Sequence, residues 1–459
     1  MTADQRQIAG LGGQLLTSLY WGVADDGEAE DLVAHLSDRL TDPACAGALL
    51  AHRASLATFS GNPSDGLQLL NLFPEVDDPM SFCQIAVTRS MTLTLAGRDV
   101  DGLAVAERAL ELHRSFSEPL LLPHPSIHEA NAAFALFHGG HPDSALSRAM
   151  TAYGIATDDR MIVSLVWCQL VAGDACLTLG RGAEAAEHFA QALHDASREH
   201  FRGQVAMAWA GIARARASLG DLAGAEEAMQ ICRAEPPGVK AFAPSIAVAE
   251  ATVMAAFRNF GSACSELHRQ ADESAQGGNV IGEAWMLHEL ARLGMSTSVA
   301  PRLIELAGTC DNAMVRVRTE FCRAMAADDA GAVSSAGERF AELGCPIFAA
   351  EAMVSAADLF GRRAEGRRAN AATLRAAAML SGCDFGPPTY VVRSTTVTPL
   401  TAREREIAYL AAEGATNREI SERLFLSLRT VENHLSKVFF KLGISSRQEL
   451  RSVVGPLQK

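Results

Sequence analysis

Apolar residues recur at helical spacing through most of the first 380 residues of the chain. The window 183–193, for example, places Ala185, Phe189, Ala192 and Leu193 on one face of a helix. Short glycine-containing breaks separate such windows at intervals of about 40 residues, at Gly97, Gly140, Gly180, Gly220 and Gly261. Because one helical pair cannot bury its apolar face alone, a helix–turn–helix unit in each period predicts an all-α solenoid of stacked pairs.

The unit around Gly220 resembles the tetratricopeptide repeat (TPR). Its matching residues are Trp209, Ile212, Ala213, Gly220, Ala225, Met229 and Pro237, and the next unit towards the N-terminus matches at Gly173, Gly180, Ala185, Phe189 and Ala192. Arg216 stands where the repeat usually has an aromatic residue, the period exceeds the ~34 residues of the repeat, and the pattern fades beyond Gly261 to weak turns near Asp328 and Gly361. We therefore expect a degenerate, TPR-like α-solenoid, with an irregular all-helical domain as the alternative.

The last 60 residues predict four short helices, at about 402–413, 417–424, 428–442 and 446–454. Thr401 with Glu404, and Thr416 with Glu419, have the spacing of a capping box, and Ser427 is a suitable N-cap for the third helix. The third helix carries one apolar stripe, at Val431, Leu435, Val438, Phe439 and Leu442. A short helix, a tight turn and a longer helix with a polar outer face have the geometry of a helix-turn-helix, whose second helix fits the major groove of DNA.

The charge of the 459-residue chain is divided unevenly. Its net charge is −14, but residues 399–459 hold ten Lys or Arg against seven Asp or Glu, and residues 1–398 carry a net −17. Between the two parts, residues 383–398 contain Gly386, Pro387 and Pro388 and a β-branched run that does not continue a helix. We expect a helical sensor or interaction domain at 1–382, a linker at 383–398 and a DNA-binding domain at 399–459.

The residues of the C-terminal part resemble the LuxR-type helix-turn-helix. The matching positions are Leu400, Thr401, Arg403, Glu404, Glu406, Ile407, Gly414, Asn417, Ile420, Leu424, Ser427, Thr430, Val431, His434, Lys441, Leu442, Gly443, Arg447 and Leu450. This resemblance covers only about the last seventh of the chain. An all-helical body ahead of such a domain is also similar in architecture to large regulators of the MalT kind, which carry an ATPase.

The resemblance implies roles for individual residues. The third helix is expected to read base edges through Glu432, Asn433 and Ser436. Phosphate contacts are expected from Asn417, Arg418, Ser427, Arg429, Thr430, Lys437 and Lys441, and dimer contacts in the fourth helix from Arg447, Leu450, Val453 and Val454. Glu432 departs from the Lys or Arg that is common there, so a sequence preference does not transfer from the family. As an alternative to binding phosphate, Asn417 would only stabilise the start of a helix, and Thr430 would only bond the backbone in the first turn.

The sequence offers little sign of other chemistry. No phosphate-binding loop of the G-x-x-x-x-G-K-[ST] type is present, and the run from Gly10 to Thr17 lacks its lysine. His124 with His128, and His138 with His141, look like surface residues beside turns, so we expect no metal site and no cofactor. Trp21, Trp167, Trp209 and Trp285 are expected to be core anchors, with a ligand-lining role as the alternative. The ten cysteines contain no C-x-x-C pair and fit a reduced cytoplasmic protein, and no signal peptide or membrane span is apparent.

These observations favour a cytoplasmic, non-enzymatic regulator of transcription. We expect it to bind double-stranded DNA as a homodimer, under the control of an unknown small-molecule or protein effector at the helical domain, without contact to a membrane. One alternative is a helical scaffold that binds other proteins. Another is the C-terminal portion of a larger, ATP-dependent LuxR-type regulator, and an enzyme with a divergent ATP site is the least favoured class.

Overall fold

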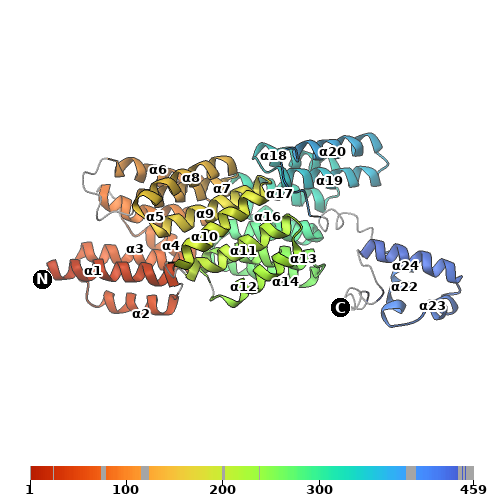
Figure 1. The fold of residues 1–459 in the computed structure, drawn as a ribbon, viewed down its shortest axis with the longest axis horizontal. Helices are drawn as coiled ribbons and strands as arrows, with labels where there is room; N and C mark the ends of the chain where they lie inside the picture. The colour runs from red at the N-terminus through yellow and green to blue at the C-terminus, as the bar shows by residue number, and fades with distance from the viewer. Residues whose placement is uncertain are drawn as a thin grey trace. The chain divides into compact units, whose positions relative to one another are not determined.

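The computed structural model of the protein describes residues 2–23, 25–73, 79–114, 124–198, 202–236, 238–388, 400–442, 447 and 450. Within these ranges the chain is helical and contains no β-strand. It divides into two compact units, residues 1–388 and 389–459 (Figure 1), and each is described here by itself. The all-α fold expected from the hydrophobic pattern is therefore confirmed.

Helical hairpins build the first unit (Figure 1). Its N-terminal elements are α1 (Thr2–Thr17), the π-helical turn η1 (Ser18–Val23), α2 (Asp26–Ser37), α3 (Pro43–Phe59) and α4 (Pro63–Leu70). Consecutive pairs then follow as α5 (Pro79–Leu95) with α6 (Asp99–His113), α7 (Pro125–Gly139) with α8 (Pro142–Asp159), α9 (Ile162–Thr178) with α10 (Gly182–Arg198), and α11 (Arg202–Ser218) with α12 (Leu222–Ala234). After the 3₁₀ turn η2 (Lys240–Phe242) come α13 (Ala243–Ala256) with α14 (Phe260–Gly277), α15 (Val280–Leu290) and the π-helical turn η3 (Ala291–Met295) with α16 (Ser296–Thr309), α17 (Ala313–Ala326) with α18 (Ala330–Glu342), and α19 (Pro346–Arg362) with α20 (Gly366–Met379).

A residue with positive φ marks the turn inside each of these hairpins from α5 onward. Gly97, Gly140, Gly180 and Gly220 have φ between 78° and 91°, as the glycine spacing predicted. The prediction at Gly261 is wrong, because that glycine lies in the first turn of α14 and the left-handed residue is Arg258. Beyond Gly261 the hairpins continue, with turns at Gly294, Asp328 and Ala364, and the glycine pattern fades as expected because two of these three residues are not glycine.

Small residues let neighbouring repeats approach closely around Phe189 of α10. A Cβ atom added to Gly173 of α9 or to Gly211 of α11 would overlap the Phe189 ring. Phe189 itself is 2% exposed. The glycine and the aromatic residue of the repeat-like pattern therefore pack against each other, which explains why both occur at these positions.

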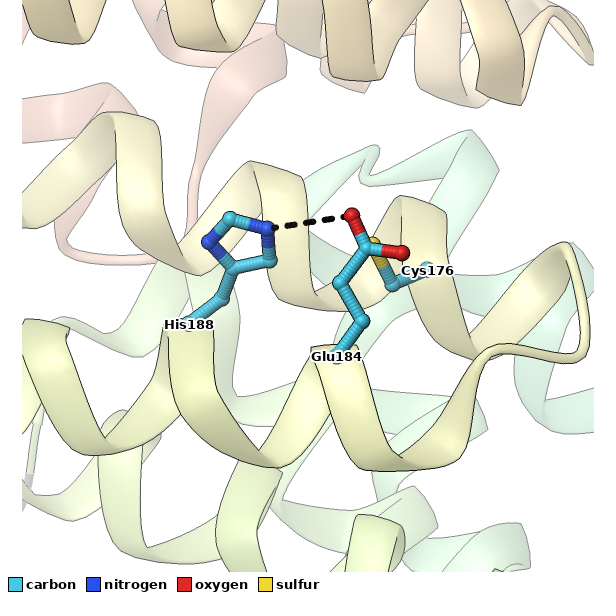
Figure 2. A group of neighbouring side chains, drawn as sticks. All are labelled: Cys176, Glu184 and His188. Carbon is cyan, nitrogen blue, oxygen red and sulfur yellow. Dashed lines mark ion pairs between the residues drawn. The ribbon is translucent and has the colours of Figure 1, made fainter. Parts of the chain in front are cut away.

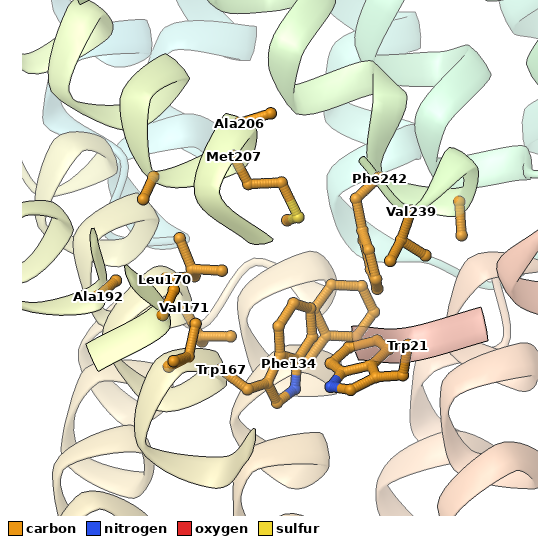
Figure 3. Close-up of a cluster of buried hydrophobic side chains, with 14 of the residues drawn as sticks. Trp21, Phe134, Trp167, Leu170, Val171, Ala192, Ala206, Met207, Val239 and Phe242 are labelled. Atoms are coloured by element: carbon orange, nitrogen blue, oxygen red, sulfur yellow. The ribbon is translucent and has the colours of Figure 1, made fainter. Parts of the chain in front are cut away.

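Aromatic side chains from distant repeats fill the interior of the first unit (Figure 3). Trp21 packs edge-on against Trp167 with ring centroids 5.7 Å apart, and Phe134 and Phe242 lie against Trp167 at 5.2 and 4.8 Å. Trp21, Trp167 and Trp285 are buried, as expected for core anchors, whereas Trp209 is only half-buried.

Hydrogen bonds also join repeats that are about 200 residues apart. The Asn312 side chain, at the start of α17, donates to Oδ1 of Asp99 at 2.8 Å and to the backbone oxygen of His138 at 2.9 Å, and the Gln204 side chain donates to the backbone oxygen of Trp21 at 2.7 Å. Because separations of 213, 174 and 183 residues occur in these bonds, the stack of hairpins turns back on itself.

The segment after α20 packs on the middle of the first unit. Its residue Asp384 accepts hydrogen bonds from the backbone nitrogens of Gly182 at 2.7 Å and Ala183 at 2.9 Å, at the first turn of α10. Residues 383–388, which were expected to begin the linker, belong to this unit. Residues 389–399 lie outside the described residues.

Two further sequence expectations concern membranes and histidines. No helix in the described parts of the chain is long and apolar enough to cross a membrane. His128 is fully buried on α7, not a surface residue, and His124 instead bonds Ser126 and Asp159. The histidine pairs singled out in the sequence form no candidate metal cluster among the described residues.

Candidate nucleic-acid interface

Three helices of the second unit follow the boundaries set by their caps. They are α22 (Ala402–Ala412), α23 (Asn417–Leu424) and α24 (Leu428–Leu442). Thr401 and Glu404 form a complete capping box at α22, and Thr416 and Glu419 form another at α23. The hydrogen bonds from Thr416 lower the pKa of the Glu419 carboxyl, so the second box stays charged over a wider pH range.

A small apolar core holds α24 against the other helices. Val431 and Val438 are fully buried, Leu435 is nearly so, and they pack with Ile407 of α22 and Ile420 of α23. Phe439 is half-buried beside them. These four residues of the predicted stripe therefore lie on the buried face of α24, and the opposite face is left to solvent. The side chain of Leu442 lies outside the described residues.

The predicted base-reading residues lie on that solvent face. Glu432, Asn433 and Ser436 are all exposed, at successive positions along one side of α24. Had Asn433 and Ser436 pointed into the core, the interpretation as a groove-reading helix would have failed. Their exposure leaves amide, hydroxyl and carboxylate groups available to base edges.

Two cations flank this polar face. Arg429 and Lys437 are exposed, and neither forms an ion pair with another described residue. Arg418 of α23 is also exposed, but its Nε lies 3.1 Å from Glu422. Exposed cations beside a helix with a polar face are suited to phosphate oxygens on either side of a groove.

The polar residues at the starts of α23 and α24 are partly engaged within the unit. The Ser427 hydroxyl accepts from the backbone nitrogen of Thr430 at 3.1 Å, and the two hydroxyl oxygens lie 2.6 Å apart. Asn417 accepts from Arg447 through its side-chain oxygen at 2.7 Å. Ser427 and Thr430 therefore stabilise the start of α24, which was the alternative role for Thr430. The start of α23 is capped by Thr416, and the Asn417 side chain bonds Arg447.

The expected dimer contacts are only partly described. Arg447 also donates to the backbone oxygen of Ala415, and Leu450 is fully buried in the apolar core. Both residues therefore support the fold of their own unit. Val453 and Val454, and the side chain of Lys441, lie outside the described residues.

One exposed residue near this face was missed by the sequence reasoning. Phe425 stands in the turn between α23 and α24, has φ +53° and is 96% exposed. Arg403 of α22 holds the same turn by donating to the backbone oxygen of Leu424. Its sequence neighbours Leu424 and Leu426 are apolar, so no signal in the sequence indicated that this aromatic side chain is exposed.

Comparison with known proteins supports a DNA-binding domain at the C-terminus. Residues 398–454 match the family described as bacterial regulatory proteins, luxR family. A segment of about this length is 48% identical over 50 residues to the transcriptional regulatory protein LiaR of Bacillus subtilis, and 49% identical over 51 residues to the oxygen regulatory protein NreC of Staphylococcus aureus. A Mycobacterium bovis protein named as a putative HTH-type transcriptional regulator is 49% identical over 51 residues.

These similarities are confined to one part of each protein. The aligned segment covers 11% of this chain, 24% of LiaR and NreC, and 6% of the Mycobacterium bovis protein. Among solved structures, a Rap protein complexed with competence and sporulation factor aligns over 83% of this chain and 98% of its own, with a TM-score of 0.48 and 13% identity. On the family match and the sequence identities, the chain carries a LuxR-family helix-turn-helix domain at its C-terminus.

Proposed function

We propose that the protein is a DNA-binding regulator of transcription in which α24 lies in the major groove. The observation that carries this proposal is the solvent face of α24, where Glu432, Asn433 and Ser436 stand between the exposed cations Arg429 and Lys437. Asn433 suits the paired donor and acceptor of adenine, and Glu432 suits the amine of cytosine. The backbone phosphates would be bound by Arg429 and Lys437, with support from Arg418, Lys441 and the helix starts at Asn417, Ser427 and Thr430.

The proposal includes binding as a homodimer to a site with two-fold symmetry. Arg447 and Leu450 act within their own unit, so the dimer part of the proposal depends on Val453 and Val454 among the residues singled out. Sedimentation of the full chain with a bound duplex measures the number of chains per duplex. A complex of one chain per duplex at all protein concentrations would contradict it.

We also propose that the first unit, which carries a net negative charge, controls DNA binding by this domain. We propose a cytoplasmic location, where bacterial DNA lies. An effector site is supported near Arg318 of α17, which is buried and forms no ion pair with any described residue. Burial lowers the pKa of its guanidinium to about 10, and the nearby Glu289 lies 2.5 Å from Arg292 instead. Because a buried guanidinium without a direct ion pair, whose Nε has no hydrogen-bond partner among the described residues, is costly, an anionic effector would stabilise this region.

Thermal unfolding in the presence of small carboxylates and phosphates tests the effector site. At least one of these anions is expected to raise the melting temperature of the wild-type chain and to have no effect on Arg318→Met. An equal shift in both proteins, or no shift in the wild type with any such anion, would contradict the assignment.

DNA binding is tested with the full chain and a random-sequence duplex library, by selection and by titration at several salt concentrations. The salt dependence is the slope of the logarithm of the binding constant against the logarithm of the salt concentration. Removal of one phosphate-binding cation should reduce the magnitude of this slope by about 0.9. Arg429→Gln combined with Lys437→Gln is therefore expected to lower the slope by about 2 and to weaken all sequences alike. Arg367→Gln, which removes an exposed arginine from α20, is the matched control and should leave the slope unchanged.

Asn433→Ala separates sequence reading from phosphate binding. This change is expected to remove about 1–3 kcal/mol of discrimination at one base pair while the salt dependence stays the same. A wild-type chain that binds no duplex with a salt-dependent affinity would end the proposal. If the variant with both Arg429→Gln and Lys437→Gln keeps the wild-type salt dependence, these two residues do not bind phosphate.

A further inference from the structure

Three side chains that metal ions favour meet between α9 and α10, remote in sequence from the DNA-binding face (Figure 2). Cys176 comes from the last turn of α9, and Glu184 and His188 lie one turn apart on α10. One sulfur, one carboxylate oxygen and one imidazole nitrogen all lie within 4.8 Å of one another. No other such group is found in the described ranges of the chain.

The imidazole of His188 is held in the orientation that a metal ligand needs. Its Nδ1 lies 2.6 Å from the side-chain oxygen of Gln169 on α9, and this oxygen can only accept. Nδ1 therefore carries the proton, and the lone pair of Nε2 faces Glu184, whose carboxylate oxygen is 3.9 Å away (Figure 2). A second hydrogen bond that fixes the tautomer of the ring is a regular feature of histidines that bind metals.

Burial of the three groups is graded from the interior to the solvent. Cys176 is fully buried, the His188 side chain is 13% exposed, and the Glu184 side chain is 44% exposed. A cation can therefore enter from the Glu184 side and reach the sulfur. Three protein ligands also leave one position of a tetrahedral site for water.

We propose that Cys176, Glu184 and His188 form a binding site for a single transition-metal dication of the zinc type. Sulfur and imidazole ligands select such ions over Mg²⁺ and Ca²⁺, which require oxygen ligands. Binding replaces the thiol proton of Cys176, which passes to the solvent, by a metal–sulfur bond.

Closure of the site requires a small rearrangement. Ligand atoms of a tetrahedral zinc site lie about 3.5 Å apart, given metal–ligand distances of about 2.0–2.3 Å. The half-exposed Glu184 side chain has room for this movement. Its present neighbour Arg181, at 3.6 Å, would be displaced to the solvent or towards Asp143, which also lies 3.6 Å from Arg181.

The test is a titration of the metal-free full chain with Co²⁺, a spectroscopic substitute for Zn²⁺. The wild type is expected to bind one equivalent with a near-ultraviolet sulfur-to-cobalt charge-transfer band and to lose this band when Zn²⁺ is added. Cys176→Ala is expected to abolish the band and His188→Ala to weaken binding at least tenfold. Gln169→Leu is expected to weaken it by about 10–100-fold, because the ring loses its second hydrogen bond.

Cys264→Ala is the control, because Cys264 is a free thiol outside the cluster and its removal should have no effect on the band. Glu184→Gln, at a half-exposed position, should keep the fold and melting temperature of the metal-free chain and still weaken binding. A wild-type chain without the charge-transfer band, or a band that persists in Cys176→Ala, would overturn the proposal. Since no DNA is present, the outcome is independent of the proposed function.

Discussion

At the scale of single residues, buried histidines make the stability of the first unit sensitive to pH. Burial lowers the pKa of His128 to about 4 and that of His138 to about 3, against about 6.5 in an unfolded chain. Below pH 6.5 the unfolded chain therefore binds protons that the folded chain does not. Stability from these two residues is complete above pH 6.5 and is lost progressively as the pH falls to about 4 for His128 and about 3 for His138.

We expect His128→Leu to reduce this loss. Each such histidine contributes a slope of about 1.4 kcal/mol per pH unit between pH 6 and 4.5, so the variant should lose stability less steeply than the wild type by about this amount. Urea unfolding at several pH values measures the difference, with His194→Gln, at an exposed position, as the control. Parallel pH profiles for the wild type and His128→Leu would show that His128 takes up a proton in the folded state.

At the scale of helices and turns, the sequence predicted the second unit better than the first. The bounds of α23 and α24 agree with the prediction, because they are fixed by local caps at Thr416 and Ser427. Turns at glycine were also found, since glycine adopts a positive φ readily. The turn at Arg258 was missed, and those at Asp328 and Ala364 were expected only as weak turns near Asp328 and Gly361. At all three residues the packing of two helices imposes the left-handed conformation on a side chain that does not favour it.

Ala364 offers a direct test of this imposed conformation. Its φ is +58° and its side chain is exposed, so Ala364→Gly removes a steric cost without removing a buried contact. We expect the free energy of unfolding to rise by about 1 kcal/mol, measured by urea denaturation. Ala369→Gly, in the interior of α20, is the control and should lower stability by a similar amount. A loss of stability in Ala364→Gly would mean that backbone entropy outweighs the strain.

The candidate metal site shows a second limit of sequence reasoning at this scale. Glu184 and His188 are four residues apart, so their shared face was predictable, but Cys176 joins them only because α9 and α10 are antiparallel. The histidine pairs considered in the sequence, which were expected to be surface residues and not ligands, belong to no candidate cluster among the described residues, and His128 is buried. Proximity across a hairpin depends on the turn, and a turn shifted by one residue would separate the three groups.

At the scale of the whole molecule, contacts between remote hairpins make the first unit different from an open array of repeats. Asn312 is fully buried, caps α17 by accepting from Val315, and bonds Asp99 and His138 of much earlier repeats. In an open array each repeat contacts only its neighbours, so unfolding can begin at one end. Here hydrogen bonds join the ends of the stack to its middle. These contacts could not be predicted from the sequence of any single repeat.

Two asparagine caps isolate the contribution of these remote contacts. Asn259→Ala removes only the cap of α14 and should cost about 1 kcal/mol. Asn312→Ala removes the cap of α17 and also leaves Asp99 and the His138 carbonyl without this partner, so we expect it to cost about 2–4 kcal/mol in all. Thermal unfolding followed by circular dichroism and by tryptophan fluorescence measures both variants. Equal destabilisation of the two variants would mean that the remote hydrogen bonds contribute little.

The return of the stack onto itself also limits how this protein can change its length in evolution. Asn312 faces Asp99, and Asp384 faces Gly182, across separations of 213 and 202 residues. Gain or loss of one helical pair between Gly182 and Asn312, the stretch that both pairings span, would move the facing residues by a whole repeat and break both pairings together. Open arrays tolerate such duplications and deletions, whereas here the number of hairpins per turn is expected to be fixed, and variation is expected only in loop lengths and at the N-terminal end.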